Sequence, residues 1–139
     1  MSNSQSEGDD ATADSILRKP LIWIPACRKD YQQLPRNVQK TFGQALAVAQ
    51  VGGKHPKAKV LGGFQGAGVL EVKDNDSGST FRVVYTVAIA GVVYVLHAFQ
   101  KKSKSGKATP AEEMDKVRSR FKEAVIDNAK RKSQIGDSE

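Results

Sequence analysis

The segment Val92-Val-Tyr-Val-Leu-His97-Ala-Phe-Gln-Lys101-Lys-Ser-Lys-Ser-Gly-Lys107-Ala-Thr-Pro110 combines an apolar run, a lysine-rich stretch and a helix start. The run from Val92 to Gln100 is mostly apolar or aromatic, which predicts a buried strand. The lysines that follow place positive charge around the end of that strand. Thr109 and Pro110, followed by acidic residues, are typical of the first turn of a helix. The segment therefore predicts a strand, a basic loop and a helix, in that order.

Upstream of this segment, the first patterns along the chain predict a strand and then helices. Leu21 to Ile24 is a short apolar run suited to a strand, and Pro25 ends it. Between residues 26 and 50 the apolar residues recur at spacings of three and four, which indicates an amphipathic helix. Pro35 interrupts this stretch, so we expect a short helix before it and a longer one from about Arg36.

The middle of the chain predicts a hairpin that continues into the final strand. Residues 53–68 are rich in glycine and lysine and are expected to form a long basic loop. Residues 69–73 and 81–87 read as strands around a turn at 74–78. Links this short favour antiparallel pairing. The expected fold is therefore α+β, with the order β-α-α-β-β-β-α and a small antiparallel sheet packed on helices.

Charge and composition divide the chain into an acidic N-terminal tail, a folded body and a C-terminal tail. Residues 1–17 carry −4 and no Lys or Arg; since the whole chain carries +7, the remainder carries +11. We expect residues 1–17 to be a disordered acidic tail, 18–128 the folded domain, and 129–139 a flexible C-terminal tail. A charge of this size favours a polyanionic partner such as nucleic acid, although many basic proteins bind no such partner.

Several classes of protein are disfavoured by composition. Cys27 is the only cysteine, so no internal disulfide can form, and a reducing cytoplasmic location fits. We expect no membrane partner, because no apolar run approaches the roughly 20 residues of a bilayer span. Neither the histidines nor the carboxylates have the spacing of metal ligands, so no metal and no cofactor are predicted.

Alternation along the hairpin strands places a candidate site on one face of the sheet. If the apolar residues face the helices, Glu71, Lys73 and Arg82 share the open, solvent-facing side. Lys101 and Lys102 follow the adjoining strand. Such a group of cations can hold a phosphodiester and stabilise the extra negative charge of a five-coordinate phosphorane. No metal is needed if the nucleophile is the neighbouring ribose 2′-hydroxyl.

Each candidate also has a structural interpretation. Arg82 is more often a cross-strand partner of an acid such as Glu71 than a phosphate ligand. His97 is by default a hydrogen-bonded core residue, although its ordinary pKa suits proton transfer, and the pattern leaves its face of the strand open. Tyr85 is expected in the core with its hydroxyl at the rim. The remaining lysines are either RNA-binding or simply solvated; they are Lys57, Lys59, Lys101, Lys104 and Lys107.

Four segments together resemble one known family. They are Lys59-Val-Leu-Gly-Gly-Phe-Gln-Gly-Ala-Gly-Val-Leu-Glu71, Phe81-Arg-Val-Val-Tyr85, Val93-Tyr-Val-Leu-His-Ala-Phe-Gln-Lys-Lys-Ser103 and Ala108-Thr-Pro110. In this arrangement the chain resembles the phage-derived, HigB-like branch of the RelE/ParE toxin superfamily, over about residues 20–126. The resemblance implies a compact α+β fold with helices on one face of the sheet.

The resemblance also implies a function and partners. It implies the toxin of a type II toxin-antitoxin pair, inhibited by a cognate antitoxin that is often a helix-turn-helix protein. RelE-like members cleave mRNA in the ribosome by 2′-hydroxyl attack, without a metal. By position, Arg82 corresponds to the family's phosphate-contacting arginine, and Lys73, Lys101 and Lys102 to its basic site groups. Lys73, Glu71 and His97 are candidate bases, and Lys102 is a candidate acid.

Two other functions fit the same residues. A ParE-like toxin that binds gyrase shares the fold and needs no catalytic residues. A non-toxic nucleic-acid-binding regulator is the third hypothesis, since the acidic residues 1–17 could cover the basic face.

Overall fold

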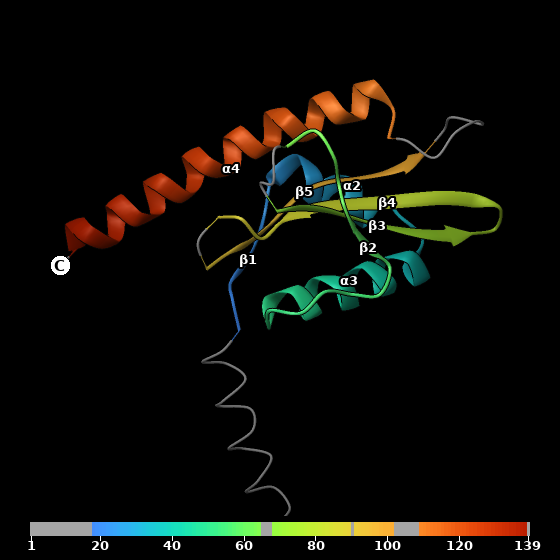
Figure 1. Ribbon diagram of the computed structural model, residues 1–139, viewed down its shortest axis with the longest axis horizontal. Coiled ribbons are helices and arrows are strands. Elements are labelled where there is room, and N and C mark those ends of the chain that lie inside the picture. Colours follow the sequence, from blue (N-terminus) through green and yellow to red (C-terminus); the bar gives the residue numbers. More distant parts are fainter. Residues whose placement is uncertain (1–17, 65–67, 90, 102–108, 139) are drawn as a thin grey trace, which may run out of the picture.

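The computed structural model describes residues 18–64, 68–89, 91–101 and 109–138. Figure 1 shows a twisted sheet between two layers of helix. In chain order the elements are β1 (Leu21–Trp23), α2 (Pro25–Gln32), α3 (Arg36–Gln50), β2 (Ala58–Val60), β3 (Val69–Asp76), β4 (Ser79–Thr86), β5 (Val93–Lys101) and α4 (Ala111–Ser138). The expected acidic tail, residues 1–17, lies outside the described residues.

The α+β fold class is confirmed, but the sheet differs from the prediction in two details. It has five strands in the order β1-β5-β4-β3-β2. The added strand, β2, lies in the segment that was expected to be a loop, and it pairs antiparallel with β3. β1 pairs parallel with β5, so the sheet is mixed rather than purely antiparallel. The long stretch of chain between β1 and β5 makes this parallel pairing possible.

The hairpin between β3 and β4 is tighter than its sequence indicates. Asp76 pairs with Ser79, which leaves Ser77 and Gly78 as the turn, with φ of 50° and 84°. Positive φ at both central residues is typical of a type I′ turn, whose twist matches that of the strands. The strand continues through the polar residues because α3 supplies partners for them: the Asn37 side-chain amide donates to Asp76 at 2.7 Å.

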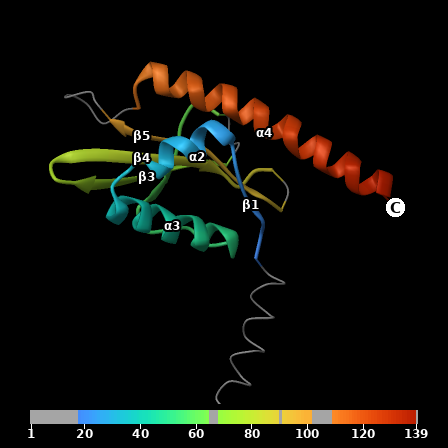
Figure 2. The ribbon, with the colours of Figure 1, turned by 180° about the vertical axis from the view of Figure 1, so that it is seen from behind.

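Helices cover both faces of the sheet, whereas the sequence predicted helices on one face. α3 lies on one side and α4 on the other in the two opposite views of Figures 1 and 2. α2 packs against β5 beyond the end of β1, where the Ile24 amide donates to the Val95 carbonyl at 3.1 Å. Coverage of both faces explains why β5 is buried from Val93 to Phe99 without alternation.

Helix α4 is longer than predicted. Val117 and Ala124 are fully buried against the sheet. The Tyr94 hydroxyl donates to Asp127 at 2.6 Å and ties the middle of the helix to β5. Beyond that point α4 continues to Ser138 and projects past the sheet, through most of the segment expected to be a flexible tail. Within the described residues, no helix is both long and apolar enough to cross a bilayer.

Tyr85 lies wholly in the core, and its hydroxyl does not reach the rim as expected. The residue is 0% exposed, and its hydroxyl has no hydrogen-bond partner among the described residues. Burial raises the pKa of this phenol. Since a buried unpartnered hydroxyl is costly, Tyr85→Phe is expected to raise the free energy of unfolding by about 1 kcal/mol. Urea unfolding measures this change, and a loss of stability would show that the hydroxyl has a partner.

Candidate functional site

Strand register brings the predicted cations together on the face of the sheet that α4 covers. Lys73 on β3 pairs with Arg82 on β4, which pairs with Phe99 on β5. Directly opposed residues of antiparallel strands share a face. Alternation along the strands adds Glu71 and Lys101 to that face. Three adjacent strands thus contribute side chains to one cluster, which we call the cation cluster: Lys73, Arg82 and Lys101.

Arg82 is held by a buried network rather than exposed on an open face. Its side chain is 2% exposed, and its Nη1 donates to Glu71 Oε1 and to Thr109 Oγ1, at 3.0 Å each. The Thr109 hydroxyl in turn donates to Glu71 Oε2 at 2.6 Å. The prediction of a solvent-facing Arg82 is therefore wrong. Thr109, which lies just before α4, contacts Arg82 on this face, and the Glu71 carboxylate offsets the cost of burying the guanidinium.

The cation cluster changes the ionisation of Lys101. Reduced hydration, followed by repulsion from Arg82 and Lys73, lowers the pKa of the Lys101 ammonium, and Glu71 opposes this shift. The shift indicates that Lys101 lies within the electrostatic field of the other two cations, although the three side chains come from different strands. Lys102, Lys104 and Lys107 lie outside the described residues.

His97 faces α4, which settles the question that its sequence pattern left open. It is 2% exposed, and its Nε2 lies 2.6 Å from Glu113 Oε1. The Arg120 guanidinium lies 2.8 Å from Nδ1 and 3.2 Å from the Leu96 carbonyl. Arginine can only donate, so Nδ1 is the acceptor and Nε2 carries the hydrogen given to Glu113. Both ring nitrogens are engaged, which disfavours His97 as a base for substrate.

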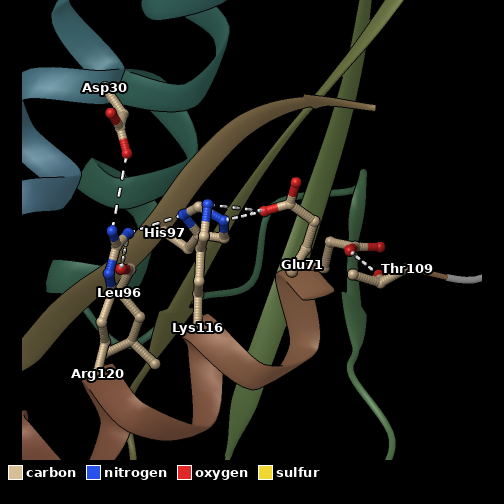
Figure 3. A network of polar contacts seen from close by, with 8 residues as sticks. Asp30, Glu71, Leu96, His97, Thr109, Lys116 and Arg120 are labelled. Atoms are coloured by element: carbon tan, nitrogen blue, oxygen red, sulfur yellow. Dashed lines mark hydrogen bonds and ion pairs between the residues drawn. The ribbon is translucent and has the colours of Figure 1, made fainter. Parts of the chain in front are cut away.

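The His97 network joins α2 and α4 to β5. Figure 3 shows Arg120 between His97 and Asp30, whose carboxylate lies 3.8 Å from the guanidinium. The Lys116 ammonium lies 3.9 Å from Glu113 on the other side. The His97 ring also stacks on Phe99, with centroids 4.6 Å apart. The network therefore fixes the start of α4 above the sheet, next to the cation cluster.

Ionisation of His97 predicts a pH-dependent stability. Burial lowers the pKa of His97 below its ordinary 6.5; Arg120 and Lys116 act in the same direction and Glu113 opposes them. The unfolded chain then binds the proton more readily, so stability is fully present above pH 6.5 and decreases as the pH falls below it. We expect a slope of at most about 1.4 kcal/mol per pH unit in the free energy of unfolding.

Thermal and urea unfolding between pH 7.5 and 5 measure this slope. His97→Gln should flatten it, whereas His55→Gln should leave it unchanged, because His55 lies outside the network. Equal slopes in the wild type and His97→Gln would contradict the assignment.

The two lysines near β2 lie on different faces of the sheet. Lys59 pairs with Glu71 and so belongs to the face of the cation cluster, where it is exposed. The Lys57 ammonium lies 3.1 Å from Asp74, which is on the α3 side. The structure thus brings Lys59 toward the candidate site and separates Lys57 from it.

Sequence reasoning missed the side chains that organise this site. Thr109 was expected to cap α4, but its hydroxyl bonds Glu71 and Arg82. The pattern uses Glu113 only as an acidic residue of the helix start, and it assigns no role to Arg120. Their spacing was a usable signal: Glu113 and Arg120 are seven positions apart, on the same helical stripe as the buried Val117. Polar residues on a buried stripe indicate buried partners.

Other reactive groups contribute little to the site. Cys27 is fully buried, and burial raises the pKa of its thiol to about 12, so it remains protonated. Among the described residues, no cluster of three His, Cys, Asp or Glu side chains has the arrangement of a metal site.

Comparison with known proteins gives a family and a fold. The family model described as Phage derived protein Gp49-like matches residues 29–122. The structure is similar to that of a double arginine-to-alanine mutant of the E. coli toxin RelE in the free state, with a TM-score of 0.52 and 18% identity. That match covers 74% of this chain and 97% of RelE. No curated protein sequence gives a significant match.

The predicted relationship is therefore confirmed at two levels. The fold, with its central sheet and flanking helices, is that of RelE. The family match covers more than half of the chain, from α2 into α4. The chain belongs to the Gp49-like family of phage-derived proteins.

Proposed function

We propose that this protein is the toxin of a type II toxin-antitoxin pair and that it cleaves mRNA on the ribosome. The observation that carries this proposal is the cation cluster, in which Lys73, Arg82 and Lys101 come from three adjacent strands to one face. Their proximity is reflected in the lowered pKa of Lys101. Family membership and the RelE fold support the toxin assignment.

The chemistry proposed is transesterification of an RNA phosphodiester. The ribose 2′-oxygen attacks phosphorus, the bond from phosphorus to the 5′-oxygen breaks, and the products are a 2′,3′-cyclic phosphate and a 5′-hydroxyl end. The 2′-hydroxyl loses a proton and the leaving 5′-oxygen gains one. Cations placed around phosphorus stabilise the additional charge of the transition state, and this electrostatic contribution is usually large.

The contacts of each side chain suggest its role. Arg82, which is buried and held by Glu71 and Thr109, is proposed to place a fixed positive charge behind the phosphate rather than to touch it. Lys101 is proposed to bind the phosphate, and Lys73 is the candidate base that remains, since Glu71 and His97 are engaged in hydrogen bonds. Lys102 remains the proposed acid for the leaving oxygen. Both carboxylate oxygens of Glu71 accept hydrogen bonds, so we assign this residue to positioning rather than to proton transfer.

The proposal includes specific partners. A cognate antitoxin, expected to be a helix-turn-helix protein, would inhibit the toxin, and the substrate would be mRNA on translating ribosomes in the cytoplasm. The phosphate contacts are expected to involve Lys59, Lys101, Lys104 and Lys107 rather than Lys57, which pairs with Asp74 on the other face.

Two lysine variants test the placement of the site. Lys101→Ala is expected to reduce ribosome-dependent cleavage by about 100-fold, because it removes a positive charge that stabilises the transition state at the phosphate. Lys57→Ala removes the same charge on the α3 side and is expected to retain cleavage within about threefold, since only an exposed ion pair is lost. Growth after induction and mapped mRNA 5′ ends provide the measurement.

Equal activity of the two variants would contradict this placement. If the wild type arrests growth with mRNA ends unchanged, and instead inhibits gyrase supercoiling without ribosomes, the gyrase hypothesis replaces the proposed nuclease.

A further inference from the structure

A cleft of about 360 Å³ lies beside the cation cluster, between the end of α2, the edge of β5 and the first turns of α4. This volume lies within the roughly 300–1,000 Å³ range of small-molecule sites in proteins. Its walls come from four elements, because Phe81 of β4 also contributes. The cleft is separate from the Glu71, Arg82 and Thr109 network described above.

The cleft combines apolar surfaces with polar groups. Leu34, Phe81 and Phe99 supply apolar surface, and the two phenylalanines are 6% and 7% exposed. Gln33 and Gln100 are exposed and bring side-chain amides that can both donate and accept. A flat ring with a hydrogen-bonding edge matches this combination better than an aliphatic ligand does.

One wall of the cleft is fixed before any ligand binds. His97 and Glu113 line this wall. The His97 Nε2 lies 2.6 Å from Glu113 Oε1, and Arg120 donates to the His97 Nδ1. The stacking of His97 on Phe99 fixes the neighbouring ring as well. A site with fixed walls loses little conformational freedom when it binds a ligand.

The position of the cleft relates it to RNA. Phe99 lines the cleft. It also pairs across the sheet with Arg82, which in turn pairs with Lys73 on the next strand. Lys116 stands at the cleft and is more than half exposed. A phosphate at the cation cluster would therefore have a neighbouring nucleotide within reach of the cleft.

We infer that this cleft binds one nucleobase of the RNA and reads its hydrogen-bonding edge; this inference rests on the proposed function. Sequence-specific RNA recognition commonly uses unstacked bases that enter pockets with apolar surfaces and polar edges. Gln33 and Gln100 are the residues assigned to the base edge. Glu113 and His97 are assigned to positioning, since they bond each other.

Cleavage preference tests the role of the two glutamines. Gln100→Ala and Gln33→Ala are each expected to reduce the preference for one base near the cleavage position by about tenfold, the equivalent of one lost hydrogen bond. The loss should appear at sites that carry the preferred base, and cleavage at the other sites should change much less. Gln44→Ala, an exposed glutamine on α3, is the matched control and should leave the preference unchanged.

A binding measurement separates failure of this inference from failure of the proposed function. Nucleoside monophosphates titrated into the full-length 15N-labelled protein should shift the side-chain amide signals of Gln33 and Gln100, but not that of Gln44. Cleavage by the wild type with preferences unchanged in both glutamine variants would overturn the inference. If the wild type cleaves nothing, the titration decides: absence of shifts at millimolar nucleotide overturns the inference, and shifts confined to Gln33 and Gln100 support it.

Discussion

Arg82→Ala is expected to lower the free energy of unfolding by about 3–5 kcal/mol, because it leaves the Glu71 carboxylate without its buried cation. The Arg82 side chain is 2% exposed and that of Glu71 is 11% exposed. Lys73→Ala is the control: it removes a cation directly across the hairpin and is expected to cost about 0.5 kcal/mol or less. Urea unfolding of the three proteins gives both values.

Two results would contradict this interpretation of Arg82. A loss of about 0.5 kcal/mol in Arg82→Ala would mean that the ion pair contributes little to the folded state. The double variant Arg82→Met with Glu71→Leu is expected to recover most of the stability, since apolar pairs can replace buried ion pairs. Failure to recover it would be the second contradicting result. The recovered protein should not cleave RNA, which separates the stabilising role of Arg82 from its proposed role in cleavage.

Thr109→Val is expected to reduce cleavage by about 100-fold while the protein remains folded. Valine has nearly the same shape as threonine but lacks the hydroxyl, which donates to Glu71 and accepts from Arg82. A displacement of about 1 Å in the charge that stabilises the transition state can cost this much in rate. The stability cost is expected to be about 1–3 kcal/mol, the range for leaving buried polar groups unpartnered.

Thr109→Ser supplies the matched control, because it restores the hydroxyl without the methyl group. Cleavage within about threefold of wild type is expected for the serine variant. If valine and serine reduce cleavage equally, packing of the methyl group matters and the hydroxyl does not. Single-turnover rates on ribosome-bound mRNA separate this effect from weaker binding.

Periodicity predicted most of the elements because their apolar spacing is regular. The break at Pro35 and the hairpin around Gly78 follow directly from local chemistry. β2 escaped prediction because it has three residues, and only Ala58 among them is buried. Its pairing depends on β3, which no local pattern encodes.

Burial of the site was harder to predict than its composition. The sequence identified the members of the cation cluster, but it placed Arg82 in solvent by assuming that one face of the sheet was open. The adjacent Val83 and Val84 point to opposite faces, and both are fully buried. This pair was a signal that both faces are covered. Glu113 and Arg120 lie on a helix distant in sequence and Thr109 lies just before it, so the contacts of all three follow from the tertiary fold alone.

The central claim is tested most directly by incubating the purified protein with a defined mRNA, with and without translating ribosomes, and mapping the RNA ends. The account predicts new 5′-hydroxyl ends within the translated region only when ribosomes are present, and their loss in Lys101→Ala but not in Lys57→Ala. Intact mRNA under conditions in which the same protein arrests growth would contradict it.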